Sequence, residues 1–154
     1  MSDLPIVGEK TPAFKAESHL GPIDLDALKG KNVVLYFYPK DNTPGCTAEA
    51  CSLNDSNSYF LDKGFVVIGV SPDSVESHSR FAAKYGLSFN LIADPEKVII
   101  QAYGAWGEKK NYGKTYMGLL RTTFVISAQG IIEQVFPKVD TKNHADQLIE
   151  ALGI

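Results

Sequence analysis

Cysteine is scarce in this chain, and long hydrophobic runs and a surplus of basic residues are absent. Only 2 of the 154 residues are cysteine, which excludes a disulfide-rich scaffold; in a reducing compartment such a pair is more often catalytic or redox-sensing. No run approaches the roughly 18 apolar residues that a membrane-spanning helix needs. The 15 Lys and Arg against 18 Asp and Glu give a net charge of -3, so nucleic acid and anionic membranes are not expected as partners.

A secretory signal is also missing from the N-terminus. The segment MSDLPIVGEK has no basic start followed by an apolar stretch, which predicts a cytoplasmic protein. Hydrophobic residues make up 44% of the chain and charged residues 21%, a composition typical of a soluble globular protein. The length of 154 residues predicts a single domain spanning 1–154.

Short apolar, β-branched runs alternate with helical patterns along the chain. Strands are predicted at 33–39, 65–71, 90–94, 121–127 and 131–137. Helices are predicted at 44–62, 74–85, 95–103 and 144–152, and a glycine- and lysine-containing loop at 106–118. Strands that alternate with helices indicate an α/β fold with a largely parallel sheet, to which the hairpin at 129–130 adds antiparallel strands. The predicted fold is a central mixed sheet flanked by helices.

Cys46 stands near the expected start of a helix. Thr43 fits the N-cap and Pro44 the first helical position, so Cys46 falls at about the third. Unpaired N–H groups and the positive end of the helix dipole favour an anion there, and we expect this thiol to ionise more readily than an ordinary cysteine's. Open α/β sheets also place their ligand sites where a strand ends and a helix begins.

Cys51 follows five residues later, on the same predicted helix. Helix geometry separates the two Cα atoms by roughly 8.6 Å, whereas a disulfide requires about 4.4–6.8 Å. The pair therefore cannot bond while the helix is intact, which favours a cysteine that first reacts with something else. A low-pKa thiolate attacks a peroxide to give a sulfenic acid, which a nearby thiol converts to a disulfide after the first turn unwinds.

The cysteines taken alone leave other interpretations open. Both could be small buried residues that fill the core, since free cysteine is among the most buried residue types. A zinc site is disfavoured because the cysteine spacing is wrong. The histidines lie in separate segments and are interpreted as surface or helix-face residues: His19, His78 and His144.

Several motifs together resemble one family. The segment PKDNTPGC, with Pro39, Thr43 and Cys46 in the pattern P-x-x-x-T-x-x-C, resembles the active-site signature of peroxiredoxins. The continuation GCTAEAC is similar to the branch called bacterioferritin comigratory protein or peroxiredoxin Q. The likeness continues through GVSPDSVESHSRF, YGAWGEKKNYGKTYMGLLRTTFVIS and the final helix. It covers nearly the whole chain.

The resemblance implies a thioredoxin-like fold and a thiol peroxidase that uses no metal, haem or flavin cofactor. Cys46 would be the peroxidatic thiolate that attacks hydrogen peroxide or a small organic hydroperoxide. Thr43 would hydrogen-bond the peroxide, and Pro39 would pack over the thiolate to limit water. Arg121 would supply a fixed positive charge, which lowers a thiol pKa and can hold the polarised O–O bond.

The resemblance also assigns the later steps. Cys51 would be the resolving cysteine, and its disulfide with Cys46 would be reduced by thioredoxin or a similar dithiol protein. Glu49 would anchor the active-site arginine, with a solvated helix residue as the alternative. Trp106 and Tyr112 would line a rim or partner surface, with core packing or plain exposure as the alternative. A resolving cysteine on the same chain favours a monomer.

The chain departs from the usual sequence of this branch after the resolving cysteine. The branch usually has an aromatic residue and then Arg-Asp after the resolving cysteine, whereas this chain has Ser52, Leu53, Asn54 and Asp55. A second positive charge near the helix is therefore missing, which puts in doubt any role for that charge in tuning the helix or docking the reductant.

Two rival functions remain beside the peroxidase. One is a general thiol–disulfide oxidoreductase, which the missing CxxC motif disfavours, and the other is a redox sensor that reacts only stoichiometrically.

Overall fold

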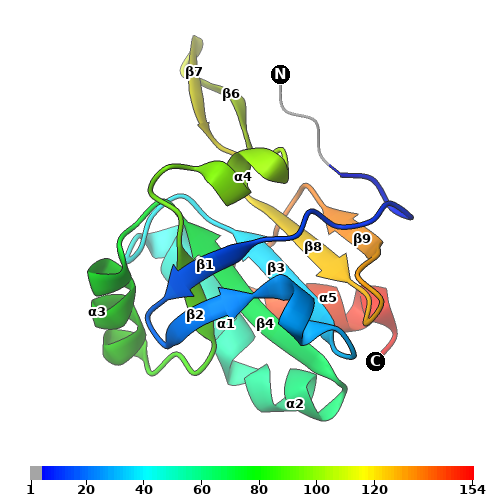
Figure 1. The fold of residues 1–154 in the computed structure, drawn as a ribbon. Coiled ribbons are helices and arrows are strands. Elements are labelled where there is room, and N and C mark those ends of the chain that lie inside the picture. Colours follow the sequence, from blue (N-terminus) through cyan, green and yellow to red (C-terminus); the bar gives the residue numbers. More distant parts are fainter. Residues whose placement is uncertain (1–4) are drawn as a thin grey trace.

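A mixed sheet of seven strands forms the centre of the computed structural model, which describes residues 5–154 (Figure 1). The strand order is β2-β1-β5-β4-β3-β8-β9. In its middle, β3 (Asn32–Phe37) lies parallel to β4 (Phe65–Ser71) and antiparallel to β8 (Thr122–Ile126). The other strands of this sheet are β1 (Lys15–Ser18), β2 (Gly21–Asp24), β5 (Asn90–Ala93) and β9 (Ile132–Phe136). The predicted α/β fold with a central mixed sheet is confirmed.

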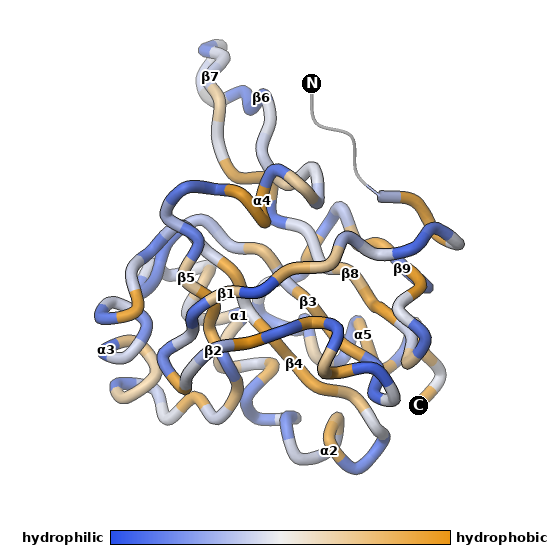
Figure 2. Tube along the Cα trace, viewed as in Figure 1, coloured by the Kyte–Doolittle hydropathy of each residue, from blue (hydrophilic) through white to orange (hydrophobic). Residues whose placement is uncertain are grey.

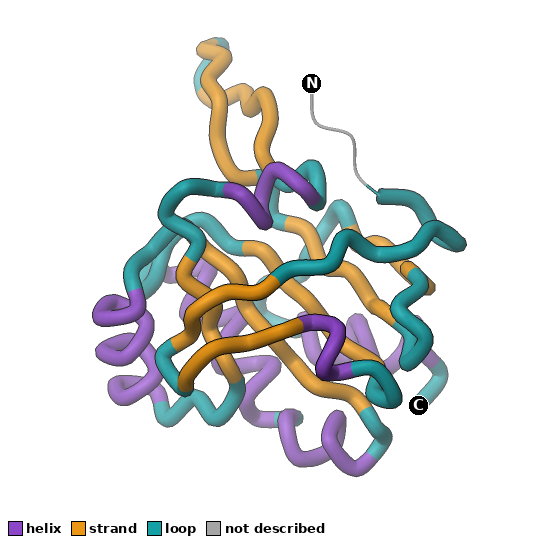
Figure 3. The backbone as a smooth tube through the Cα atoms, viewed as in Figure 1, coloured by secondary structure: helices purple, strands orange, loops and turns teal. Residues whose placement is uncertain are grey.

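Helices cover both faces of this sheet, as the helix and strand colours of Figure 3 show. Side chains of α1, α2, α3 and α5 pack on one face, and those of η1 and α4 pack on the other. The helices are η1 (Leu25–Leu28), α1 (Pro44–Asp55), α2 (Asn57–Asp62), α3 (Val75–Tyr85), α4 (Val98–Ala102) and α5 (His144–Leu152).

Strand β3 contributes to the core on both faces. Val34 and Tyr36 belong to the cluster on the α1 face, whereas Val33 and Leu35 belong to the cluster on the α4 face. Successive strand residues point to opposite faces, so a strand with helices on both sides must be apolar throughout. The hydropathy colouring accordingly shows the central strands as largely hydrophobic (Figure 2). This explains why β3 appears in the sequence as a continuous apolar run.

Two sequence predictions are wrong in detail. The helix predicted over 44–62 is two helices, because Ser56 leaves the helical conformation with φ -107° and ψ 9°. The surrounding Asn, Asp and Ser residues compete for backbone hydrogen bonds, which weakens a helix at this point. The segment predicted as a loop at 106–118 is a hairpin, β6 (Trp106–Asn111) and β7 (Lys114–Leu119), which projects from the body (Figure 1).

The sequence analysis missed two strand pairs, the hairpin β6–β7 and the N-terminal pair β1–β2. Tyr112 and Gly113 at the tip of β6–β7 both have positive φ, 52° and 76°, which suits the tight turns of two-residue hairpins. The strand β7 is largely exposed, so it has no apolar alternation that would mark it as a strand. The hairpin β1–β2 and helix η1, similarly, lie in a segment where proline and glycine were the only clear signals.

Gly69 provides a test of the packing in the centre of the sheet. A Cβ atom added at Gly69 would lie 2.8 Å from Cζ of Tyr36 and 2.9 Å from Cδ2 of Leu91, both fully buried. Gly69→Ala is therefore expected to lower the free energy of unfolding by about 1–3 kcal/mol, measured by urea denaturation. Gly118→Ala on β7 is the control, because it meets only the flexible side chains of Lys109 and Tyr116. Equal losses in the two variants would contradict this account of the core.

Candidate active site

The loop after β3 leads directly into helix α1 and carries the first site residues. Thr43 occupies the N-cap position, and its carbonyl accepts the first helical hydrogen bond from the N–H of Thr47 at 2.8 Å. Its hydroxyl does not cap the helix as predicted but donates to the carbonyl of Lys40 at 2.9 Å. Pro44 is the first helical residue, as predicted, so Cys46 is the third and is 1% exposed. Pro39 lies half-buried in the same loop.

Arg121, the residue before β8, connects helix α1 to the sheet. Its Nη2 donates to Cys46 Sγ at 3.3 Å, and its Nη1 donates to Glu49 Oε1 at 2.6 Å. The guanidinium also passes close to Gly45, where an added Cβ atom would lie in ordinary contact with Nη2 at 3.4 Å. Burial alone would lower the pKa of Arg121, but the Glu49 carboxylate and Cys46 raise it above the ordinary value. The guanidinium is therefore a permanent cation beside the thiol.

Glu49 is not a solvated helix residue. Its side chain is 0% exposed, one turn of α1 beyond Cys46. Desolvation by burial raises the pKa of Glu49 to about 7, against the opposing effect of Arg121. Oε1 takes the arginine hydrogen bond, whereas Oε2 has no hydrogen-bond partner among the described residues. The predicted contact between Glu49 and Arg121 is present in the structure.

Asp41 fixes the loop that precedes the helix. Its carboxylate accepts hydrogen bonds from the Tyr38 hydroxyl at 2.6 Å and the Ser77 hydroxyl at 2.8 Å, and it lies 2.7 Å from His78 Nδ1. Its own N–H donates to Asp73 at 2.8 Å. Burial alone would raise the pKa of Asp41, but these hydrogen bonds and the charge of His78 lower it. Sequence reasoning missed this network, because its members come from two separate segments, 38–41 and 73–78.

Cys51 lies on the same unbroken helix as Cys46, and both thiols are free. The Cα atoms of two residues five apart on an α-helix are roughly 8.6 Å from each other. Cys51 is half-buried; partial burial, and then the nearby Asp55 carboxylate, raise the pKa of its thiol. The structure therefore presents a reduced pair that cannot bond without a change in α1.

Asn54, where the branch usually has arginine, makes neutral contacts. Its amide nitrogen donates to the carbonyl of Gly86 at 2.9 Å, and its amide oxygen accepts from the N–H of Ser88 at 2.9 Å. Asn57 donates to the hydroxyl of Ser88 at 2.9 Å. These bonds attach the end of α1 to the segment after α3. The Asn54 side chain therefore has a structural role that does not require a positive charge.

His78 on α3 and His144 on α5 are helix residues, which is one of the two alternatives interpreted from the sequence. Both are 0% exposed, so the other alternative, a surface residue, is wrong for them. His78 pairs with Asp41, and its Nε2 donates to the carbonyl of Ile92 at 2.9 Å. His144 begins helix α5 and lies 3.8 Å from Glu49 Oε2. Among residues 5–154 no group of three or more metal-ligating side chains is placed to hold an ion.

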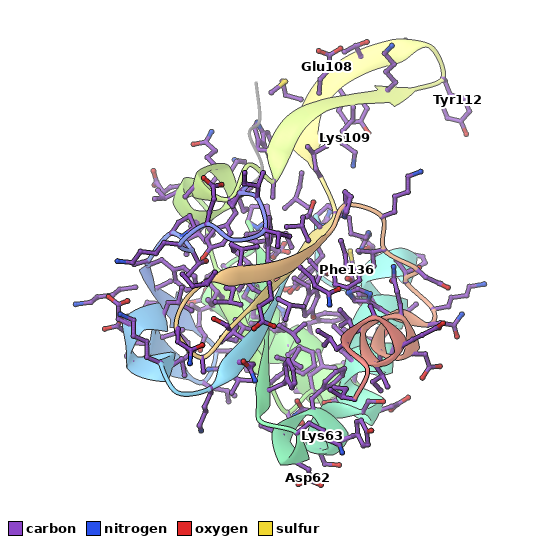
Figure 4. The ribbon with its side chains drawn as sticks, turned by 90° about the vertical axis from the view of Figure 1, so that its right-hand side faces the viewer. Asp62, Lys63, Glu108, Lys109, Tyr112 and Phe136 are labelled. Carbon is purple, nitrogen blue, oxygen red and sulfur yellow. The ribbon has the colours of Figure 1, made fainter. Side chains whose placement is uncertain are left out.

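The rim residues predicted from sequence lie on the hairpin. Trp106 is partly buried against the α4-side core, with Nζ of Lys97 5.2 Å from its ring centroid. Tyr112 is 97% exposed at the tip (Figure 4).

In the part of the chain that the structure describes, no helix is long and apolar enough to cross a membrane.

Comparisons with known proteins identify similar sequences and similar folds. Residues 7–135 match the model of the AhpC/TSA family. Peroxiredoxin Bcp of Bacillus subtilis is 44% identical over 147 residues, which cover 95% of this chain and 94% of the relative. The bacterioferritin comigratory protein of Xanthomonas campestris, described for its alkyl peroxide reduction activity, superposes with a TM-score of 0.85 at 38% identity, covering 91% of this chain and 90% of that one. A cysteine-to-serine variant of PrxQ from Xylella fastidiosa superposes with a TM-score of 0.91 at 30% identity, covering 99% and 98%. The predicted thioredoxin-like fold is confirmed.

Arg121→Met tests the electrostatics of the buried pair. The folded-state pKa of Glu49 is raised from 4.5 to about 7, so its contribution to stability is present below the lower value and is lost as the pH rises through 7. Removal of the compensating arginine is expected to lower the free energy of unfolding by about 3 kcal/mol at pH 8.5 and by far less at pH 5.5, where Glu49 is neutral. Urea denaturation at both pH values measures the difference.

The matched control for Arg121→Met is the same substitution in a Glu49→Gln background. When the Glu49 carboxylate is absent, and Cys46→Ser is present in every variant so that no thiolate titrates beside Arg121, the loss of stability should be nearly independent of pH. A pH-independent loss in the single variant as well would mean that Glu49 is not held by Arg121 in solution.

Proposed function

The chain belongs to the AhpC/TSA family, among the Bcp and PrxQ peroxiredoxins, and from this premise we propose that Cys46 is its peroxidatic residue and Cys51 its resolving residue. It is a thiol-dependent peroxidase. The observation that carries the assignment of Cys46 is the 3.3 Å hydrogen bond to its Sγ from Arg121 Nη2. A planar guanidinium at this distance stabilises a thiolate and can also hold the polarised O–O bond of a peroxide. The substrates are hydrogen peroxide and small organic hydroperoxides.

The first step is attack of the Cys46 thiolate on one peroxide oxygen. An S–O bond forms and the O–O bond breaks, so the sulfur loses two electrons and the leaving oxygen takes a proton to depart as water or an alcohol. Thr43 supports this geometry, because its hydroxyl proton is already donated to Lys40 and its oxygen remains free to accept from the peroxide O–H. Pro39 shields the thiolate from water.

In the second step the Cys51 thiolate attacks the sulfenic sulfur of Cys46. The S–S bond forms, the S–O bond breaks, and the oxygen leaves as water after taking up a proton. The two thiols start on one continuous helix, too far apart for a disulfide, so the first turns of α1 must unwind. The resulting disulfide is intramolecular.

The cycle closes when thioredoxin or a similar dithiol protein reduces this disulfide by thiol–disulfide exchange. The protein acts as a monomer, because both cysteines of the cycle lie on one chain and no partner subunit has to supply a thiol. Its proposed compartment is the cytoplasm, where dithiol reductants keep such cysteines reduced.

A count of free thiols after one equivalent of hydrogen peroxide tests this function. Wild-type protein should lose both thiols within seconds and remain monomeric on a non-reducing gel. Cys51→Ser should lose its single thiol equally fast but stop at the sulfenic acid, which a dimedone trap detects by mass spectrometry.

The matched control is Cys46→Ser, whose remaining Cys51 thiol should survive the same treatment. Survival of both wild-type thiols for many minutes would contradict the proposal and favour a general thiol–disulfide oxidoreductase. Rapid loss of both thiols without any recycling by thioredoxin would instead favour a stoichiometric redox sensor.

A further inference from the structure

His144 lies behind the Arg121–Glu49 pair with one ring nitrogen facing a carboxylate oxygen. We propose that His144 and Glu49 share one exchangeable proton, and that through this proton His144 is a positioning residue for Arg121 and Cys46. The kinetic part of this inference rests on the proposed role of Cys46. The sharing of the proton does not, since it concerns the reduced protein alone.

The hydrogen bonds of Gln147 determine which nitrogen of His144 carries a proton. The amide nitrogen of Gln147 donates to the carbonyl of Lys138 at 3.0 Å, and its Oε1 accepts from the N–H of Asp140 at 3.1 Å. This fixes the orientation of the amide. The same Oε1 lies 2.9 Å from His144 Nδ1, so Nδ1 must be the donor.

The other nitrogen, Nε2, is therefore an acceptor when the ring is neutral. It accepts a hydrogen bond from the hydroxyl of Thr123 at 2.8 Å. Desolvation by burial lowers the pKa of His144, although Gln147 acts in the opposite direction, so the ring is neutral near pH 7. The ring of Phe136 on β9 meets it edge-on at 6.4 Å between centroids, and Figure 4 shows this residue beside helix α5.

Glu49 Oε2 faces Nε2 at 3.8 Å and has no hydrogen-bond partner among the described residues. Because Nε2 already has the Thr123 hydroxyl as a partner, the unsatisfied atom is Glu49 Oε2, and a buried carboxylate oxygen without a donor is costly. A proton shared by Oε2 and Nε2 removes this cost, because the Thr123 hydroxyl can rotate and give up its bond to the Nε2 lone pair or accept one from a protonated Nε2. The 3.8 Å between Nε2 and Oε2 is longer than the roughly 2.7–3.0 Å of a hydrogen bond, so sharing the proton requires the two side chains to move closer together.

The charges around Glu49 couple this proton to Cys46. Arg121 supplies the one cation in contact with the Glu49 carboxylate among the described residues, and the other ionisable groups facing it are Cys46 on its own helix, His144 on α5 and the buried Tyr36 hydroxyl on β3. The cluster of Arg121, Glu49 and Cys46 is neutral when Cys46 is a thiol and Glu49 is a carboxylate. When Cys46 is a thiolate and Glu49 is still a carboxylate, the cluster carries a buried net charge of minus one, which a low-dielectric environment opposes.

Transfer of the proton resolves this imbalance. When Cys46 gives up its proton and the Glu49–His144 pair takes up one, the thiolate and Arg121 form the ion pair and the cluster remains neutral. The two titrations are then coupled, and neither belongs to one residue alone. Among the groups that face His144, Asp140 and Arg121 are charged and act in opposite directions on its proton.

Imidazole ¹⁵N NMR of the reduced full-length protein tests the shared proton directly. At neutral pH the Nε2 signal of His144 should be that of an unprotonated nitrogen, and it should change on acidification as the Glu49–His144 pair takes up its proton. In Glu49→Gln this titration should move by about one pH unit or more, because the carboxylate is gone. Phe136→Leu, which changes the packing on His144 but no charge, should leave the midpoint unchanged within about 0.2 units.

The coupling to Cys46 has a kinetic readout. His144→Gln places an uncharged amide donor beside Oε2, so the Glu49 carboxylate is satisfied without taking up a proton. We expect the rate of Cys46 oxidation by peroxide to fall roughly three- to tenfold at pH 6.5 and to be nearly unchanged at pH 9. This corresponds to a shift of about 0.5–1 pH unit in the acidic limb of the pH–rate profile. In a Glu49→Gln background the same substitution should not shift that limb.

Each result has a distinct meaning. A flat His144 signal from pH 5 to 9, or one that ignores Glu49→Gln, would overturn the shared proton. A loss of rate that is equal at every pH would show that His144 has a merely structural role. If peroxide failed to oxidise wild-type Cys46 at all, the proposed function would fail while the NMR result still stood.

Discussion

An intact helix α1 holds the Cα atoms of Cys46 and Cys51 roughly 8.6 Å apart, and the proposed chemistry depends on this separation. While the helix is whole, the Cys46 thiol is buried and hydrogen-bonded by Arg121, and it is too far from Cys51 to form a disulfide. Once the sulfur has been oxidised, the same separation makes unwinding a condition of the next step. The spacing of the two cysteines thus sets the order of the two reactions.

The surroundings of α1 confine this change to a short segment. Before the helix, Asp41 is bound by Tyr38, Ser77 and His78, which anchors the loop independently of Cys46. After Cys51, Asn54 is bound to the segment that follows α3. Unwinding between these two anchors leaves the strands in place but removes Cys46 and Ala50 from the core cluster on the α1 face of the sheet. The site therefore combines a fixed sheet with the first turns of α1, which have to move.

Strong local signals made much of this frame predictable, whereas contacts between distant segments did not appear in the sequence. The apolar runs at 33–39 and 65–71 predicted β3 and β4, and Thr43-Pro44 predicted the start of α1. The resemblance placed Arg121 beside Cys46, and the structure has that contact. The burial of His144 against Glu49 was missed because its position on α5 gives no local sign of what lies across from it. The hairpin at 106–119 was missed because its exposed strand lacks apolar alternation.

Hydrogen exchange of the α1 amides, compared between the reduced and the peroxide-oxidised protein, tests the required unwinding most directly. The account predicts that amides between 47 and 52 are protected in the reduced protein and exchange rapidly once the disulfide has formed, while those of β3 and β4 stay protected. Peroxide-treated Cys51→Ser, which cannot form the disulfide, is the control, and a dithiol should restore protection to the wild type. Equal protection of α1 in the reduced and disulfide states would contradict the account, because the bond would then have formed across an intact helix.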